Sequence, residues 1–172
     1  MATPPPIDAT VTHADERMHA TQESIHSHCV VCGSRNSLGL HLQFSACPDG
    51  GVQAEFSCPR PYEGYPDTLH GGIICALLDG AMTNCLFALG RSALTAELRV
   101  RFLRPVAIGR RVTVRAWVEN AHRPLFYLAA ELRQDDEIVA TGRAKFMERK
   151  PPLDDRSRSV GSLAAQDVGG RS

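Results

Sequence analysis

The stretch HGGIICALLD, residues 70–79, opens an apolar segment that runs to Leu89 and is followed by Gly90, a common residue after the end of a helix. The apolar side chains of this segment spread around the whole circumference of a helix instead of forming one stripe, which is typical of a helix buried on all sides. The segment from about Gly71 to Leu89 is therefore expected to be a central helix that other elements surround.

Apolar and polar residues alternate with a period of two on both sides of this helix, which predicts strands with one buried face. The expected strands are 40–46 and 52–58 before the helix, and 94–102, 112–118, 126–132 and 138–146 after it. Their connections are short enough for antiparallel neighbours. The pattern predicts an α+β fold in which a curved antiparallel sheet of about five to six strands wraps around one long central helix.

Charge and hydropathy restrict the partners of the chain. Its 19 basic residues balance 19 acidic ones, so nucleic acid and anionic membranes are not expected as partners. Asp79, Thr83 and Asn84 interrupt the apolar helix, and no stretch is expected to reach the roughly 18 apolar residues of a membrane span. The first residues have no apolar run typical of a signal peptide, so a cytoplasmic location is expected.

The 172 residues suffice for one domain of ordinary size. Residues 1–24 and 151–172 are polar and lack the apolar content of a core. We expect a mobile N-terminal segment over 1–24, one folded domain over 25–150 and a disordered C-terminal tail over 151–172.

Two features of the central helix carry chemistry. Gly71 and Gly72 place bare backbone N–H groups at its N-terminal end, where free donors and the helix dipole favour a negative oxygen. This is the outline of an oxyanion hole. The alternative is that the glycines serve only a tight turn into the helix. Asp79 is a carboxylate among apolar side chains, so it must be hydrogen-bonded, face a cleft or be neutralised, which favours a functional role.

The spacing of these two features predicts an assembly. Gly72 and Asp79 are seven residues apart, which is roughly 10 Å along one helix. One reacting carbonyl needs its nucleophile and its donors each about 3 Å away, so it cannot contact both. The two halves meet only if a second helix lies antiparallel to the first, which predicts a two-fold dimer with composite sites.

The motif His70-Gly71-Gly72 with Asp79, followed by TAELRVRFLRP at residues 95–105, resembles the hotdog-fold acyl-CoA thioesterases of the PaaI-like group. The resemblance covers about residues 29–147. It implies a hotdog fold, a homodimer or a homotetramer built from two dimers, and hydrolysis of acyl-CoA with an aryl or medium-chain acyl group, without a cofactor. It further implies that Asp79 is the nucleophile or general base, that the N–H groups of Gly72 and Gly71 hold the oxyanion, and that His70 shapes the turn.

The same resemblance makes Thr95 and Glu63 candidates. Thr95 matches a hydroxyl that orients the attacking water or the carboxylate in some members. By alternation alone it lies opposite the Leu94, Ala96 and Leu98 face, which is expected to be buried, and would be an ordinary polar strand residue. Glu63 stands where related enzymes place Asn or Gln, but an ionised carboxylate cannot donate a hydrogen bond. Two alternatives therefore stay open: a hotdog hydratase or dehydratase that uses a histidine, and a non-catalytic acyl-CoA binding module.

Arg99, Arg101 and Arg104 lie along the polar side of the strand after the helix. Arginine pairs well with phosphate, and coenzyme A carries phosphates, so the three are candidate substrate-binding residues. The alternative is a solvated strand face.

The segment His26 to Cys32 contains a CxxC pair with two nearby histidines. Zinc usually takes ligands from two separated segments, and no second CxxC or HxxxH follows, so no metal is expected. A zinc-dependent interaction protein is the alternative. The segment 29–40 also resembles a stretch that precedes the first strand in one branch of the thioesterase-like proteins.

Overall fold

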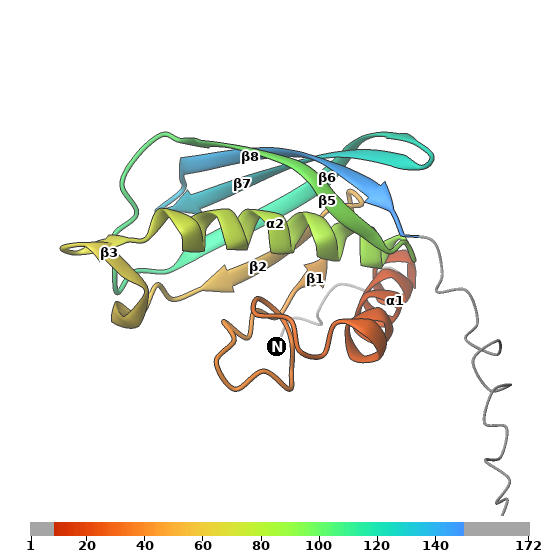
Figure 1. Ribbon diagram of the computed structural model, residues 1–172, viewed down its shortest axis with the longest axis horizontal. Coiled ribbons are helices and arrows are strands. Elements are labelled where there is room, and N and C mark those ends of the chain that lie inside the picture. Colours follow the sequence, from red (N-terminus) through yellow and green to blue (C-terminus); the bar gives the residue numbers. More distant parts are fainter. Residues whose placement is uncertain (1–8, 150–172) are drawn as a thin grey trace, which may run out of the picture.

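The structure is a computed structural model that describes residues 9–149. A six-stranded antiparallel sheet in the order β1-β2-β6-β7-β8-β5 curves around helix α2 (Gly71–Ala88) (Figure 1). The strands are β1 (Ser45–Ala46), β2 (Val52–Phe56), β5 (Ala93–Phe102), β6 (Val112–His122), β7 (Leu125–Gln134) and β8 (Glu137–Glu148). The predicted sheet around a central helix is confirmed.

Helix α2 is buried around most of its circumference, but not on all sides as its apolar pattern predicts: Ala76, Asp79 and Thr83 are only half-buried along one side, and Gly72 is exposed. Leu77, Leu78, Ala81 and Met82 have no solvent-exposed surface. By length and hydropathy alone α2 reaches what a membrane span requires, so the expectation that its polar residues would prevent this is wrong. Helix α2 is 67% buried inside the fold, and the core helix of a globular protein meets the same criteria of length and hydropathy.

An N-terminal helix, α1 (Ala9–Ile25), lies where the sequence analysis expected a mobile segment. Its Met18 is fully buried. Arg17 donates a hydrogen bond to the carbonyl of Ala88 at the end of α2 (3.0 Å). The apolar pattern could not reveal α1, because one buried methionine and polar contacts hold it instead of an apolar stripe. Residues 1–8 and the expected tail 151–172 lie outside the described residues.

The first strand is much shorter than predicted. Leu42 and Phe44 are buried, as their alternation indicates, but only Ser45 and Ala46 pair with β2. The backbone before them leaves the strand conformation, with φ +53° at His41. The N–H of Leu42 bonds instead to the carbonyl of Val31 (2.9 Å). Leu42 and Phe44 are therefore buried because an extended loop packs against the core, and not because they belong to a strand.

Strand β5 contains a β-bulge that reverses part of the predicted face. Thr95 pairs with Phe146 and Glu97 with Lys145, which leaves Ala96 without a partner residue. One extra residue shifts the alternation by one position. The expectation that Leu94 and Ala96 are buried is therefore wrong, because both are exposed. Thr95 is exposed as well, but it pairs with the buried Phe146 and its hydroxyl reaches Asp79 of α2.

Candidate active site

The N-terminal end of α2 is enclosed by a short hairpin. A 3-10 turn (Arg60–Tyr62) leads into β3 (Glu63–Tyr65), which pairs with β4 (Thr68–Leu69) beside the start of α2 (Figure 1). The hairpin is tied to the helix by a hydrogen bond from the His70 N–H to the Tyr62 carbonyl (2.9 Å). A Cβ at Gly64 would lie only 3.0 Å from the His70 Cα, so any larger residue would crowd the start of the helix.

A pocket of about 260 Å³ lies at this turn, lined by Gly64, Tyr65, Leu69, His70 and Gly71. Its position places it beside the first N–H groups of α2, which have no carbonyl partner inside the helix. The backbone donors of the helix end are thus beside a cavity.

The two backbone N–H groups at this turn differ in whether they already donate a hydrogen bond. The Gly72 N–H donates to Nδ1 of His70 (2.9 Å), so His70 caps the helix. No group within residues 9–149 accepts a hydrogen bond from the Gly71 N–H. Because the His70 side chain is exposed, its rotation would free the second donor. Sequence reasoning did not foresee this cap, since histidine is not a usual capping residue.

Asp79 lies in the middle of α2 with Thr95 as its partner. The Thr95 hydroxyl donates to Oδ1 of Asp79 (2.7 Å), an interaction that the β5 bulge makes possible. Burial raises the pKa of the Asp79 carboxyl above its usual value, and the Thr95 hydrogen bond opposes that shift. A carboxylate with a raised pKa and one fixed hydrogen bond is a suitable general base.

The two halves do not meet within one chain. Both belong to α2, and seven residues separate Gly72 from Asp79, a rise of roughly 10 Å. Strand β5, which carries Thr95, is an edge strand that pairs only with β8 among the described strands. Phe102 on this edge is 54% exposed, and its ring lies 3.6 Å from where a Gly71 Cβ would be.

Glu63 is engaged within its own loop. Its carboxylate accepts a hydrogen bond from the Asp67 N–H and lies 3.9 Å from the Arg60 guanidinium. It is not among the residues that line the pocket at His70, but lines a neighbouring hollow with Arg60, Gly64 and Pro66. These contacts give Glu63 a role in holding the hairpin.

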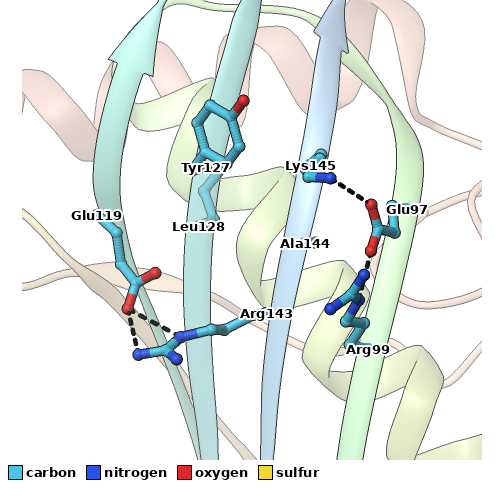
Figure 2. Close-up of a pocket in the computed structure, with 8 residues that line it drawn as sticks. All are labelled: Glu97, Arg99, Glu119, Tyr127, Leu128, Arg143, Ala144 and Lys145. Carbon is cyan, nitrogen blue, oxygen red and sulfur yellow. Dashed lines mark hydrogen bonds and ion pairs between the residues drawn. The ribbon is translucent and has the colours of Figure 1, made fainter.

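Two of the three candidate arginines lie on the face of the sheet away from α2, and the third lies beyond the end of β5. Arg99 lies on the face away from α2, where its guanidinium and the Lys145 ammonium flank the Glu97 carboxylate (Figure 2). Arg101 lines an adjoining hollow on that face. Arg104 pairs with Glu137 (2.7 Å). All are exposed, and none joins either half-site of its own chain.

The structure also brings His26 and Cys29 close enough to Asp79 to affect it. A charge on Cys29 raises the pKa of Asp79, and a charge on His26 lowers it. A hydrogen bond from the Cys32 thiol lowers the pKa of Cys29 well below the usual value of a thiol. The sequence carried no signal for this proximity, because about fifty residues separate the loop from Asp79.

Comparison with known proteins agrees with this architecture. Residues 67–141 match the thioesterase superfamily. The chain is 31% identical over 78 residues to the acyl-coenzyme A thioesterase THEM4 of Bos taurus, an alignment that covers 45% of this chain and 32% of the relative. It is 26% identical over 110 residues to human acyl-coenzyme A thioesterase 13, covering 62% of this chain and 78% of that protein. The chain thus spans about a third of the first relative and most of the second.

Solved structures share the fold. The PaaI protein of the E. coli phenylacetic acid degradation operon matches with a TM-score of 0.68 at 18% identity, over 83% of this chain and 97% of that one. A Streptococcus mutans protein bound to acetyl CoA matches with a TM-score of 0.59 at 16% identity, over 63% of this chain and 88% of the other. At these identities the likeness establishes the hotdog fold.

Proposed function

We propose that this chain is a hotdog-fold member of the thioesterase superfamily, whose model matches residues 67–141, and that it hydrolyses acyl-CoA thioesters to free acid and coenzyme A. The observation that carries the proposal is Asp79, a partly buried carboxylate with a raised pKa that Thr95 holds by one hydrogen bond. Two curated relatives that are named acyl-coenzyme A thioesterases support the substrate class. A hotdog neighbour with acetyl CoA bound supports it as well.

In the proposed reaction Asp79 is the general base. It takes a proton from a water molecule as the water oxygen bonds to the thioester carbon, and the carbonyl electron pair moves onto oxygen. The resulting oxyanion collapses, the C–S bond breaks, and the proton held by Asp79 passes to the leaving thiolate of coenzyme A. If Asp79 attacks directly instead, an acyl anhydride forms first and water then releases the acid.

The N–H groups of Gly71 and Gly72 are proposed to hold the oxyanion. Donors at a helix N-terminus stabilise charge that develops in the transition state without having to reorganise. The Gly71 N–H has no acceptor within residues 9–149, and the Gly72 N–H joins it once His70 turns away. His70 then acts by positioning the turn and covering the second donor.

A dimer would complete the site. The exposed apolar side chains on and beside strand β5 include Leu94, Phe102, Leu103 and Met147. An apolar sheet edge of this kind favours a partner chain over solvent. Because Thr95 and Phe102 of this edge border the two half-sites, a two-fold partner that covers it would bring Asp79 of one subunit toward the Gly71 turn of the other.

The direct test is a panel of acyl-CoA substrates. We expect the full chain to release thiol from benzoyl-, phenylacetyl- or medium-chain acyl-CoA, measured with a thiol-reactive dye, and the preferred acyl group to identify the substrate. Tight binding of acyl-CoA without any thiol release across the panel would instead support a binding module. The absence of both binding and release would contradict the proposal.

A further inference from the structure

A second group of reactive side chains lies in the loop after α1. A ring nitrogen of His26 and the Sγ atoms of Cys29 and Cys32 all lie within 4.8 Å of one another. No other group of three such donors occurs in residues 9–149. The six cysteines of the chain are free thiols in the structure, so these two sulfurs remain available as ligands.

The spacing of these donors fits a tetrahedral metal ion. Zinc binds thiolate sulfur at about 2.3 Å and imidazole nitrogen at about 2.0–2.1 Å, so two such ligands at a tetrahedral angle are about 3.6 Å apart. The Sγ of Cys32 lies 3.6 Å from Nδ1 of His26. The separation of these two atoms therefore already matches that of two zinc ligands.

Tight packing holds the loop in this conformation. A Cβ at Gly33 would lie 2.4 Å from the Cys29 nitrogen, so the turn over the cysteines requires glycine there. A Cβ at Gly80 of α2 would lie 2.6 Å from Cγ1 of Val31, between the two cysteines. The loop is thus seated closely on α2, and its donors are fixed before any ligand arrives.

Neighbouring groups hold each of the three candidate ligand side chains in place, as outer-shell groups do in metal sites. The Val31 N–H points at Sγ of Cys29 (3.3 Å), and the Asn84 amide points at Sγ of Cys32 (3.6 Å). The His26 ring packs edge-on against Phe87, with 5.1 Å between ring centroids. Asn84 and Phe87 belong to α2, so a distant segment supplies outer-shell groups although all three ligands come from one loop.

We propose that His26, Cys29 and Cys32 bind one Zn²⁺ ion per chain through one ring nitrogen and two thiolates, with a fourth position for a water molecule. Cys32 is buried, whereas His26 and Cys29 are half-buried, which leaves a side from which the ion and water can enter. The ion binds both sulfurs as thiolates, so any thiol proton that they still carry is released to solvent. This revises the expectation of no metal, which rested on all three ligands coming from one segment. The site does not depend on the proposed hydrolysis.

Cobalt substitution tests the site directly. The full chain, reduced and stripped with a chelator, is titrated with Co²⁺ under anaerobic conditions. We expect saturation at one equivalent, with thiolate-to-cobalt charge-transfer absorption and the intense visible bands of a tetrahedral complex, both lost when Zn²⁺ is added. Absence of thiolate-to-cobalt absorption in the fully reduced chain would overturn the proposal.

Variants then assign the ligands. Cys29→Ser and His26→Gln are each expected to weaken Zn²⁺ binding by roughly 100-fold or more, because loss of a ligand should exceed the 10- to 100-fold cost of disturbing an outer-shell group. Cys47→Ser, which alters another half-buried cysteine, is the matched control and should bind as the parent does. Equal affinity in all three variants would contradict the assignment.

A measurement on the unmodified chain guards against variants that fail to fold. One equivalent of Zn²⁺ should protect Cys29 and Cys32, and no other cysteine, from alkylation, as mapped by peptide mass spectrometry. Protection of a different pair, or of none, would also reject the site.

Discussion

The two halves of the candidate active site lie on one helix but depend on different parts of the chain. At the start of α2 the chemistry belongs to the backbone N–H groups of Gly71 and Gly72, which have no side chain to cover them. The one side chain that acts there is that of His70, which accepts a hydrogen bond from the Gly72 N–H. At Asp79 the chemistry belongs to one carboxylate, whose pKa is shifted most by burial and by the Thr95 hydroxyl. Removal of a side chain therefore tests the second half, whereas the first half requires removal of a backbone hydrogen.

The largest effect is expected from Asp79→Asn. Loss of a general base should lower kcat, measured by thiol release, by roughly 100- to 10,000-fold. Binding of acyl-CoA, measured by calorimetry, should persist. Burial raises the pKa of Asp79 in the folded state, so the fold favours the protonated carboxyl over the ionised one. The free energy of unfolding therefore falls as the pH rises from the unfolded-state pKa through the folded-state pKa of Asp79. At neutral pH the variant should therefore melt at a Tm no lower than the parent. Full activity would remove Asp79 from the mechanism.

The backbone half is tested by comparing Gly72→Pro with Gly72→Ala. Both add a Cβ that would lie 3.0 Å from Nδ1 of the exposed His70 ring, but only proline removes the N–H. Proline is tolerated in the first helical turn, so α2 should persist. We expect kcat to fall by about 100- to 1,000-fold in the proline variant and far less in the alanine variant. Equal losses in the two would mean that the added carbon, not the missing donor, is responsible.

A smaller effect, and a change in pH dependence, is expected for Thr95→Val. Its hydrogen bond stabilises the ionised carboxylate, and such bonds contribute about 1.5–3 kcal/mol, so activity should fall roughly 10- to 100-fold. Because the bond lowers the pKa of Asp79, its loss raises that pKa, and the acidic limb of the kcat profile should move to higher pH. Thr95→Ser keeps the hydroxyl and should retain the parental limb. An unchanged limb in Thr95→Val would show that the bond does not act on the reacting group.

The sequence predicted most of the fold because burial of apolar side chains determines it. The apolar circumference of α2 and the alternation in the later strands were sufficient for the sheet that surrounds the helix. Helix α1 was missed because its attachment rests on Met18 and polar contacts such as that of Arg17. Contacts between distant polar groups leave no periodic trace in a sequence.

The same distinction applies to the candidate site. A carboxylate in an apolar helix and a glycine pair at its start stand out in the sequence, so Asp79, Gly71 and Gly72 were identifiable. The direction of Thr95 was not, because it depends on a bulge at Ala96 that breaks the alternation without a glycine or proline to mark it. The cap from His70 likewise depends on a side-chain rotamer.

Mixing two inactive variants tests the composite site most directly. Asp79→Asn and Gly72→Pro each spoil both sites of a homodimer, but a mixed dimer keeps one site with an intact Asp79 facing an intact Gly72. With equal amounts and random exchange of subunits, activity should recover to about a quarter of the parental value, since half of the dimers are mixed and each has one good site. If exchange is shown by mass spectrometry and activity stays at the level of the separate variants, Asp79 and Gly72 do not act across a subunit interface.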